Sequence, residues 1–198
     1  MPDFELENKI WSKGYTYICG VDEAGRGPLA GPVCAAAVIL PQDCNIEGLN
    51  DSKKLSEKKR ELLFDEIIDA AIDFSICYAT VAEIEEFNIL NATFIAMNRA
   101  INELGVVPDY CLIDGNREPK GILFPCETVI KGDAKSNSIS AASILAKVSR
   151  DRLMLKYDSE YPGYGFAKHK GYGTKEHYEA IRQMGVCPIH RLSFLKNV

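Results

Sequence analysis

The most informative residues in this chain are two adjacent carboxylates beside a glycine-rich turn. Asp22 and Glu23 follow the apolar run 17–21, and the Gly-Arg-Gly turn 25–27 comes almost directly after them. An acidic pair at the end of a strand can hold a hard divalent cation, because such cations prefer oxygen ligands. The turn lacks side-chain bulk at two of its three positions, so its backbone can close against a sugar or a phosphate. Metal and phosphate in one loop indicate phosphodiester chemistry.

Two further carboxylates lie beside glycines where apolar runs end. Asp114 precedes a glycine, and Asp133 follows one. Ligands of α/β sheets bind at strand ends, so Asp114 reaches Asp22 if the first and fourth predicted strands are neighbours. Successive strand residues point to opposite faces, so we expect Glu23 to join them only if the strand ends or bulges there. Asp133 comes just before a long predicted helix and can lean into the same site.

These four carboxylates predict a metal centre. Packed together they repel one another and raise each other's proton affinity, which makes them tolerable mainly around a divalent ion. A ligand set of oxygens, without histidine or cysteine, favours Mg²⁺ or Mn²⁺ over zinc. Two such ions about 4 Å apart can activate water and stabilise the leaving oxygen of a phosphodiester. Asp-Gly is also a common turn, and Asp114 taken alone favours that plainer interpretation.

Residues 25–30 also match the Gly-x-Gly-x-x-Gly/Ala pattern of dinucleotide-binding proteins. That pattern needs a helix that begins inside it and presents its N-terminus to a pyrophosphate. Here Pro28 and Pro32 lead into a run of alanine and β-branched residues, which is typical of a strand. Asp22 and Glu23 would also repel a pyrophosphate that carries no metal. The sequence therefore disfavours a dinucleotide site.

A glycine-rich loop with aromatic and basic side chains, 161–175, is a second candidate for ligand binding. Its lysines offer phosphate contacts and its aromatic rings offer faces for a sugar or a base. These side chains are Lys168, Lys170 and Lys175, and Tyr164, Phe166 and Tyr172. An ordinary surface loop with anchoring aromatics is an equally good interpretation of this segment taken alone.

Two more basic residues are weaker candidates for the same role. His169 fits a phosphate or surface contact better than a metal ligand, because His177 and His190 lie at no ligand spacing from it. Lys53 belongs to a second basic turn, 53–54, that follows an Asp-Ser pair.

The hydrophobic patterning predicts the elements that position these residues. We expect strands over 16–21, 33–40, 74–81, 109–114 and, more weakly, 128–130, and helices over 57–72, 92–104, 138 to about 157, and from near 174. Ser56 and Asn91 are the expected N-caps of the first two helices. Strands first, then strands alternating with helices, are typical of an α/β fold with a mixed sheet flanked by helices.

The charge of the chain is unevenly distributed. The net charge is −5, yet residues 147–198 carry 10 lysines and arginines against 5 acidic residues. Residues 1–146 carry 13 and 23. A basic C-terminal quarter beside an acidic body is a plausible surface for a nucleic-acid backbone, although such charge runs are often just solvated faces.

Cysteine usage and the N-terminus favour a cytoplasmic protein. The seven cysteines form no Cys-x-x-Cys pair, which disfavours a zinc knuckle and a redox motif. Several lie in apolar runs, where a reduced thiol behaves as a small hydrophobe. The acidic start of the chain does not resemble a secretory signal.

Together these motifs resemble the type 2 ribonuclease H family, and within it bacterial ribonuclease HII. The resemblance extends over almost the whole chain and is most specific in its first and last motifs. The motifs lie at 20–33, 51–56, 113–115, 131–133, 138–147 and 169–174.

This resemblance implies a ribonuclease H-like fold, with a five-stranded mixed sheet, flanking helices and extra C-terminal helices. We therefore expect residues 1–198 to form one such domain, in which roughly 159–198 is an extension that contributes to duplex binding. The implied activity is Mg²⁺- or Mn²⁺-dependent hydrolysis of RNA in RNA–DNA hybrids. Cleavage 5′ of ribonucleotides embedded in duplex DNA is also implied, with 3′-hydroxyl and 5′-phosphate ends.

The resemblance also implies roles for single residues. The catalytic metal-binding carboxylates would be Asp22, Glu23, Asp114 and Asp133. The ribose 2′-hydroxyl would be recognised by Gly25, Arg26 and Gly27, with Tyr172 on the neighbouring sugar. The related ribonuclease HIII class typically has lysine in place of Arg26, which favours ribonuclease HII.

Two other classes of function stay open at this point. A DNA nuclease or resolvase of related fold would cleave all-DNA substrates. A catalytically idle binding module would bind hybrids without metal-dependent turnover. No feature suggests an obligate oligomer, so we expect a monomer without a membrane association.

Overall fold

A five-stranded mixed sheet is the centre of the fold in the computed structural model, which describes residues 2–195. The strands are β1 (Ile18–Ala24), β2 (Val33–Ile39), β3 (Asp73–Ala79), β4 (Tyr110–Asp114) and β5 (Cys126–Val129). Their order across the sheet is β3-β2-β1-β4-β5. β1 pairs antiparallel with β2 and parallel with β4. The predicted neighbourhood of the first and fourth strands is thus confirmed.

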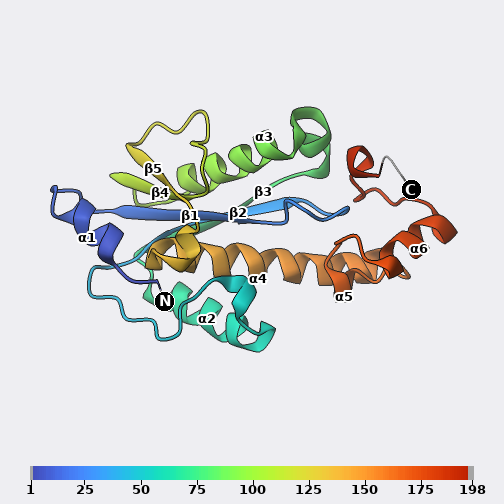
Figure 1. Cartoon of the computed structure of the whole chain (residues 1–198), viewed down its shortest axis with the longest axis horizontal. Coiled ribbons are helices and arrows are strands. Elements are labelled where there is room, and N and C mark those ends of the chain that lie inside the picture. The colour runs from blue at the N-terminus through green and yellow to red at the C-terminus, as the bar shows by residue number, and fades with distance from the viewer. Residues whose placement is uncertain (1, 196–198) are drawn as a thin grey trace.

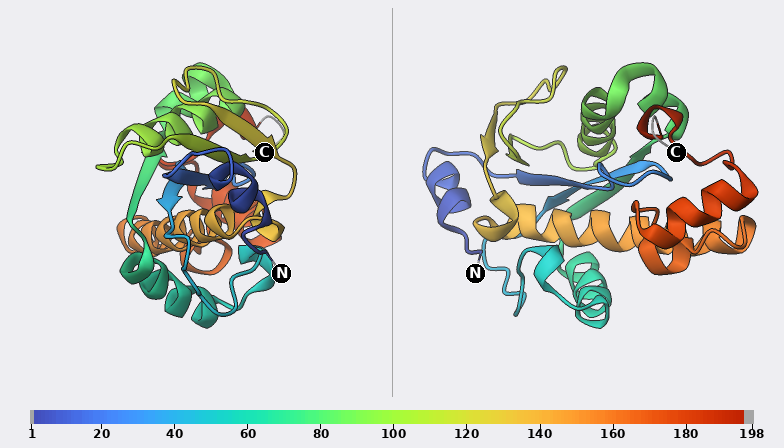
Figure 2. Two further views of the ribbon diagram at one scale, coloured as in Figure 1. Left: turned by 90° about the vertical axis from the view of Figure 1, so that its left-hand side faces the viewer. Right: turned by 45° about the vertical axis from the view of Figure 1, so that its right-hand side comes forward.

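Helices cover both faces of this sheet (Figure 1). They are α1 (Glu5–Trp11), α2 (Glu57–Ala70), α3 (Val81–Asn102), α4 (Asn137–Glu160), α5 (Phe166–His169) and α6 (Lys175–Met184). α3 packs on one face, and α2 and α4 pack on the other, as the end-on view of Figure 2 shows. The α/β class and the five-stranded mixed sheet are confirmed. In the described residues, no helix combines the length and apolarity needed to span a membrane.

α4 approaches β1 closely because small residues line their contact. A Cβ atom on Gly20 would lie 2.1 Å from the carbonyl carbon of Ser138, which no real side chain tolerates. The helix begins beside this contact, where the Ser136 side chain caps the backbone N–H of Ile139. The N-terminal end of α4 therefore lies against the strand that carries Asp22.

The predicted start of α3 was wrong. The helix begins at Val81 rather than 92, because Thr80 and Glu83 form a reciprocal capping box. Asn88 interrupts it with a φ of 64° and a ψ of 165°, a non-helical conformation that residues other than glycine rarely adopt. The Asn88 side chain then accepts the backbone N–H groups of Leu90 and Asn91. The cap of the second helical stretch is thus Asn88, not Asn91.

The C-terminal elements pack on the loop that follows β1. Their apolar cluster joins Leu29, Ala30 and the α4 residue Met154 to Phe166 and Ile181. The aromatic loop 161–174 contains the short helix α5, which the sequence did not predict. Glycine at 165 and Lys170, both with positive φ, bound this helix. The division of the chain at about 159 stays a prediction, and its last residues, 196–198, lie outside the described range.

Candidate active site

Three carboxylates meet at the end of the β1–β4 pair. Oxygen atoms of Asp22, Glu23 and Asp114 lie within 4.8 Å of one another. Asp22 is buried, and the other two are partly exposed. Oxygen ligands at this spacing suit a hard divalent cation. The structure thus brings together three of the four carboxylates that the sequence singled out, while their role stays a prediction.

Glu23 joins this cluster close to the end of β1. The β1–β2 register continues without a bulge through Asp22, Glu23 and Ala24. β4, however, ends at Asp114, and its last partner on β1 is Val21. No residue of β4 is therefore paired with Glu23, and a Glu23 carboxylate oxygen lies within 4.8 Å of one from Asp114. β1 ends at Ala24, one residue after Glu23, so the expected strand end is confirmed and the alternative of a bulge is not.

Backbone N–H groups orient two of the three carboxylates. The N–H of Glu23 donates to Asp22 Oδ1 at 2.7 Å, and the N–H of Gly132 donates to Asp114 Oδ1 at 2.6 Å. A side chain at position 132 would crowd this contact, because its Cβ atom would lie 2.5 Å from Ile139 Cδ1 and 3.2 Å from Asp114 Oδ1. The turn before α4 thus holds Asp114 in place.

The cluster is electrostatically strained without a cation. Burial, followed by the charges of Glu23 and Asp114, raises the pKa of Asp22 well above its usual range. Burial also raises the pKa of Glu23, although the nearby Arg26 opposes this shift. The Arg26 guanidinium lies 3.4 Å from Glu23 Oε1. Carboxylates that resist ionisation when empty gain most from a dication, so the donor set fits a metal.

Asp133 lies beside this cluster rather than within its 4.8 Å group. Its pKa is raised by burial and by the charges of Asp51 and Asp114. Lys53 faces the same groups, and the charges of Asp22, Asp133 and Asp51 raise its pKa against the opposing effect of burial. Lys53 therefore lies close to the acidic cluster, while its contact with substrate stays a prediction, and Asp51 is an acidic neighbour that the sequence analysis did not single out.

A buried arginine holds the Gly-Arg-Gly turn from behind. The Arg191 guanidinium donates from Nη2 to the Gly25 carbonyl at 2.6 Å and from Nη1 to the Arg26 carbonyl at 3.0 Å. Its Nε donates to the Gly31 carbonyl at 2.8 Å. Arg191 is fully buried, and no carboxylate of the described residues forms an ion pair with it. The Arg191 guanidinium thus fixes the conformation of the loop through its hydrogen bonds to backbone carbonyls.

A second buried arginine, Arg150 of α4, completes this support. It donates to the carbonyls of Ala30, Pro32 and Lys170 at 3.0, 3.1 and 3.0 Å. A Cβ atom at position 25 would lie 2.0 Å from Arg150 Nε, and Gly25 has a φ of +98°. Only glycine therefore fits there. We call Arg150 and Arg191 the arginine clamp. The sequence analysis missed both, because an arginine without a motif looks like a surface charge.

Tyr172 lies against the same turn. Its ring is 46% exposed, and its Cε1 would contact a Cβ atom on Gly27 at 3.6 Å. A hollow of about 270 Å³ lies between the turn, Tyr172, Lys53 and the α4 residue Lys147. A second hollow of about 360 Å³, on the α3 side, is lined by Glu23, Arg26, Asp114 and Arg117 among others. Glu23 borders both hollows.

Three predicted contacts of the aromatic loop were wrong, because their side chains are buried. Tyr164 and Phe166 stack on each other in the C-terminal core and offer no face to a sugar or a base. His169 is also buried, and both of its ring nitrogens are used within the protein. Its Nε2 bonds the Tyr164 carbonyl, and its Nδ1 accepts the N–H of Gly171. His169 thus shapes the loop instead of contacting a phosphate.

The three lysines of the loop differ in the partners that their amines have within the protein. Lys168 is exposed and forms an ion pair with Glu176 at 2.7 Å. Lys170 donates to the Ala167 carbonyl at the end of α5. Lys175 is exposed at the start of α6. A phosphate contact would require Lys168 and Lys170 to exchange these partners, so their roles stay predictions.

Comparisons with known proteins agree on one family. The family model described as ribonuclease HII matches residues 19–197. A ribonuclease HII of Lachnoclostridium phytofermentans is 61% identical over 195 residues, which are 98% of this chain and 76% of that protein. One of Clostridioides difficile (strain 630) is 59% identical over 193 residues, 98% of this chain and 75% of that protein. Among solved structures, ribonuclease H2 from Pyrococcus horikoshii matches with a TM-score of 0.74 and 32% identity, covering 90% of this chain and 93% of that one.

Proposed function

This chain belongs to the ribonuclease HII family and is a nuclease, and we propose that its substrates are RNA–DNA hybrids and duplex DNA that contains ribonucleotides. It would hydrolyse the RNA strand of the hybrids and cut the DNA on the 5′ side of each embedded ribonucleotide. The products would carry 3′-hydroxyl and 5′-phosphate ends. The observation that carries the proposal is the cluster of Asp22, Glu23 and Asp114 beside the clamped turn 25–27.

The proposed metal ligands are Asp22, Glu23 and Asp114, with Asp133 as the fourth carboxylate of the site. The cation would be Mg²⁺ or Mn²⁺, and two such ions are proposed when substrate is bound. When bound, the metal supplies Lewis acidity towards the scissile phosphate and an acidified water. The carboxylates would fix the position of the metal ion, and Lys53 adds a positive charge beside them.

Recognition of the ribonucleotide is proposed for the turn Gly25-Arg26-Gly27 together with Tyr172. A 2′-hydroxyl both donates and accepts hydrogen bonds, and it distinguishes RNA from DNA at a given position. The Gly25 and Arg26 carbonyls are already held by Arg191, so the turn meets the sugar in a fixed shape. Tyr172 presents its half-exposed ring next to Gly27, where the neighbouring sugar would pack.

The grip on the duplex is proposed for the region from about 159, with Lys168, Lys170 and Lys175 near the phosphates. Lysines neutralise phosphates and release their counterions, which favours binding of any duplex. We further propose that the protein acts as a monomer in the cytoplasm, in the repair of ribonucleotides in DNA.

The test uses three labelled duplexes: one with a single ribonucleotide, one continuous RNA–DNA hybrid, and one all-deoxy control. Each is incubated with Mg²⁺, with Mn²⁺ or with EDTA, and the products are mapped on a denaturing gel. We expect metal-dependent cleavage of the first two, with a cut on the 5′ side of the lone ribonucleotide. Cleavage of the all-deoxy duplex would favour a DNA nuclease, and binding without turnover would favour an idle module.

A further inference from the structure

A hollow away from the acidic cluster lies against the C-terminal half of α4. Its volume is about 690 Å³, which is in the range of pockets that hold a drug-sized ligand. Its wall combines α4 with the end of β3, the first turn of α3 and two stretches of irregular chain. The lining residues are Pro32, Tyr78, Thr80, Val81, Ala82, Ser149, Arg152, Leu153, Lys156, Tyr157, Pro188 and Ile189. We call it the α3–α4 pocket.

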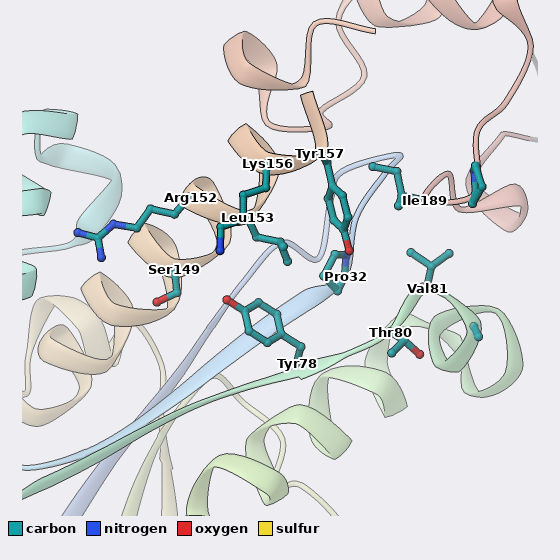
Figure 3. Close-up of a pocket in the computed structure, with 12 residues that line it drawn as sticks. Pro32, Tyr78, Thr80, Val81, Ser149, Arg152, Leu153, Lys156, Tyr157 and Ile189 are labelled. Carbon is teal, nitrogen blue, oxygen red and sulfur yellow. The ribbon is translucent and has the colours of Figure 1, made fainter. Parts of the chain in front are cut away.

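Both polar and apolar side chains line the pocket (Figure 3). The Lys156 amine and the hydroxyls of Ser149 and Tyr78 lie on one side. Apolar surface comes from Leu153 beside Lys156 and from Pro32, Val81 and Ile189, near which the hydroxyls of Tyr157 and Thr80 also lie. A ligand that fits must therefore join an apolar group to a polar one.

The charge of the lining favours an anionic ligand. Its two charged residues, Arg152 and Lys156, are both basic, although the chain as a whole carries −5. The Arg152 guanidinium is turned away to form an ion pair with Glu61 of α2. Lys156 is exposed and forms no ion pair with a carboxylate of residues 2–195. One free cation beside an apolar wall suits a single carboxylate rather than a row of phosphates.

The pocket and the candidate active site use different faces of α4. Ser143 and Lys147 line the hollow beside the Gly-Arg-Gly turn, whereas Leu153 and Lys156 line the α3–α4 pocket. A ligand in the pocket would therefore leave the acidic cluster open. Its back wall is continuous with the clamped loop, because the Pro32 carbonyl accepts from Arg150 and the Ile189 carbonyl accepts from the N–H of Gly31.

We propose that the α3–α4 pocket docks a peptide segment of a partner protein in which an acidic residue adjoins an apolar side chain. The acidic residue pairs with Lys156, and the apolar side chain enters between Leu153, Tyr157 and Ile189. Aromatic side chains such as Tyr157 commonly line grooves that bind extended peptides. The partner holds the nuclease without covering its substrate face.

The probe is a fluorescein-labelled peptide with the core Glu-Glu-Leu-Phe, compared with the cores Lys-Lys-Leu-Phe and Glu-Glu-Ser-Ser. Binding is measured by fluorescence anisotropy, and its place is mapped by amide shifts in NMR. We expect the first peptide alone to bind and to shift the amides of Leu153, Lys156 and Ile189. The two control peptides test the charge and the apolar side without altering the protein.

The matched variants are Lys156→Glu in the pocket and Lys13→Glu near α1, each of which reverses the charge of an exposed lysine. We expect Lys156→Glu to weaken the peptide by about tenfold or more, and Lys13→Glu to leave it unchanged. Both variants should cleave the single-ribonucleotide duplex like the wild type, which separates this test from that of the proposed nuclease activity. No peptide binding, equal binding of all three peptides, or competition between peptide and duplex would overturn the proposal.

Discussion

Ionisation of the Asp22 carboxylate is unfavourable in the metal-free site. It is buried, it adjoins two other carboxylates, and the N–H of Glu23 holds one of its oxygens. In the folded protein its pKa is therefore raised above the ordinary value of about 3.9. Between about pH 3.9 and that raised pKa, the folded state consequently binds more protons than the unfolded chain. The free energy of unfolding therefore falls as the pH rises through this range.

We expect Asp22→Asn to remove the cost of burying this charge beside two other carboxylates, and to abolish nuclease activity. Without metal at neutral pH, the variant should unfold at a higher temperature than the wild type, and the difference should shrink as pH falls towards 4. Cleavage should drop by at least about 100-fold, since an amide is a poorer ligand for a hard cation. Calorimetric melting over a pH series, with EDTA, measures the first effect, and gel assays measure the second. Asp69→Asn, an exposed change on α2, is the control and should alter neither.

Arg191 offers a second test at this scale. Arg191→Lys keeps the charge but loses the fork that holds the Gly25 and Arg26 carbonyls. We expect kcat/KM at a lone ribonucleotide to fall by about 10- to 100-fold, because a misplaced turn no longer positions the sugar. The lost hydrogen bonds should also destabilise the fold by about 2–4 kcal/mol in urea titrations.

The control for that change is Arg182→Lys on the exposed side of α6. Circular dichroism at the assay temperature establishes that both variants are folded. Equal activity of Arg191→Lys and the wild type would show that the turn keeps its shape without the guanidinium.

At the scale of elements, the contact between α4 and β1 decides whether the carboxylates converge. We expect Gly20→Ala to destabilise the protein by about 3 kcal/mol or more, because the new Cβ atom meets the backbone at Ser138 and cannot be avoided by a rotamer change. Urea unfolding measures the loss. Gly105→Ala is the matched control, since the nearest atom to its Cβ would lie at an ordinary 3.5 Å.

The elements that local signals define were predictable from the sequence. Ser56 and Thr174 cap α2 and α6 where the patterning placed those helices. The start of α3 was not predictable, because its first turns are short and end at Asn88, whose non-helical backbone conformation no hydrophobic period reveals. α1 was missed as well, since it is only 7 residues long.

In the candidate site too, features set by neighbouring residues were predictable, and features set by residues far along the chain were not. The grouping of Asp22 and Asp114 was predictable, because both follow strand residues that pair in parallel. The burial of Tyr164 and Phe166 was not, since it depends on a cluster with Leu29 and other residues far along the chain. The role of Arg191 was equally hidden, because the carbonyls it holds precede it by about 160 positions or more.

For the whole molecule, the uneven charge predicts how duplex binding responds to salt. Replacing Lys168, Lys170 and Lys175 with alanine should reduce the slope of log affinity against log salt by about 2–3, since each phosphate contact contributes about 0.9. Fluorescence anisotropy with a non-cleavable duplex measures the slope. The control replaces Lys13, Lys58 and Lys120, which are exposed elsewhere. An unchanged slope in the first variant would place the duplex on another surface.

The measurement that tests the central claim most directly is titration calorimetry of Mn²⁺ into the metal-free protein, run beside cleavage of the single-ribonucleotide duplex over the same Mn²⁺ series. If Asp22, Glu23 and Asp114 form the catalytic metal centre, wild-type cleavage rises with metal occupancy. Asp114→Asn then loses both Mn²⁺ binding and cleavage. Wild-type cleavage in EDTA, or an Asp114→Asn variant that cleaves within a few fold of the wild type, would contradict the account.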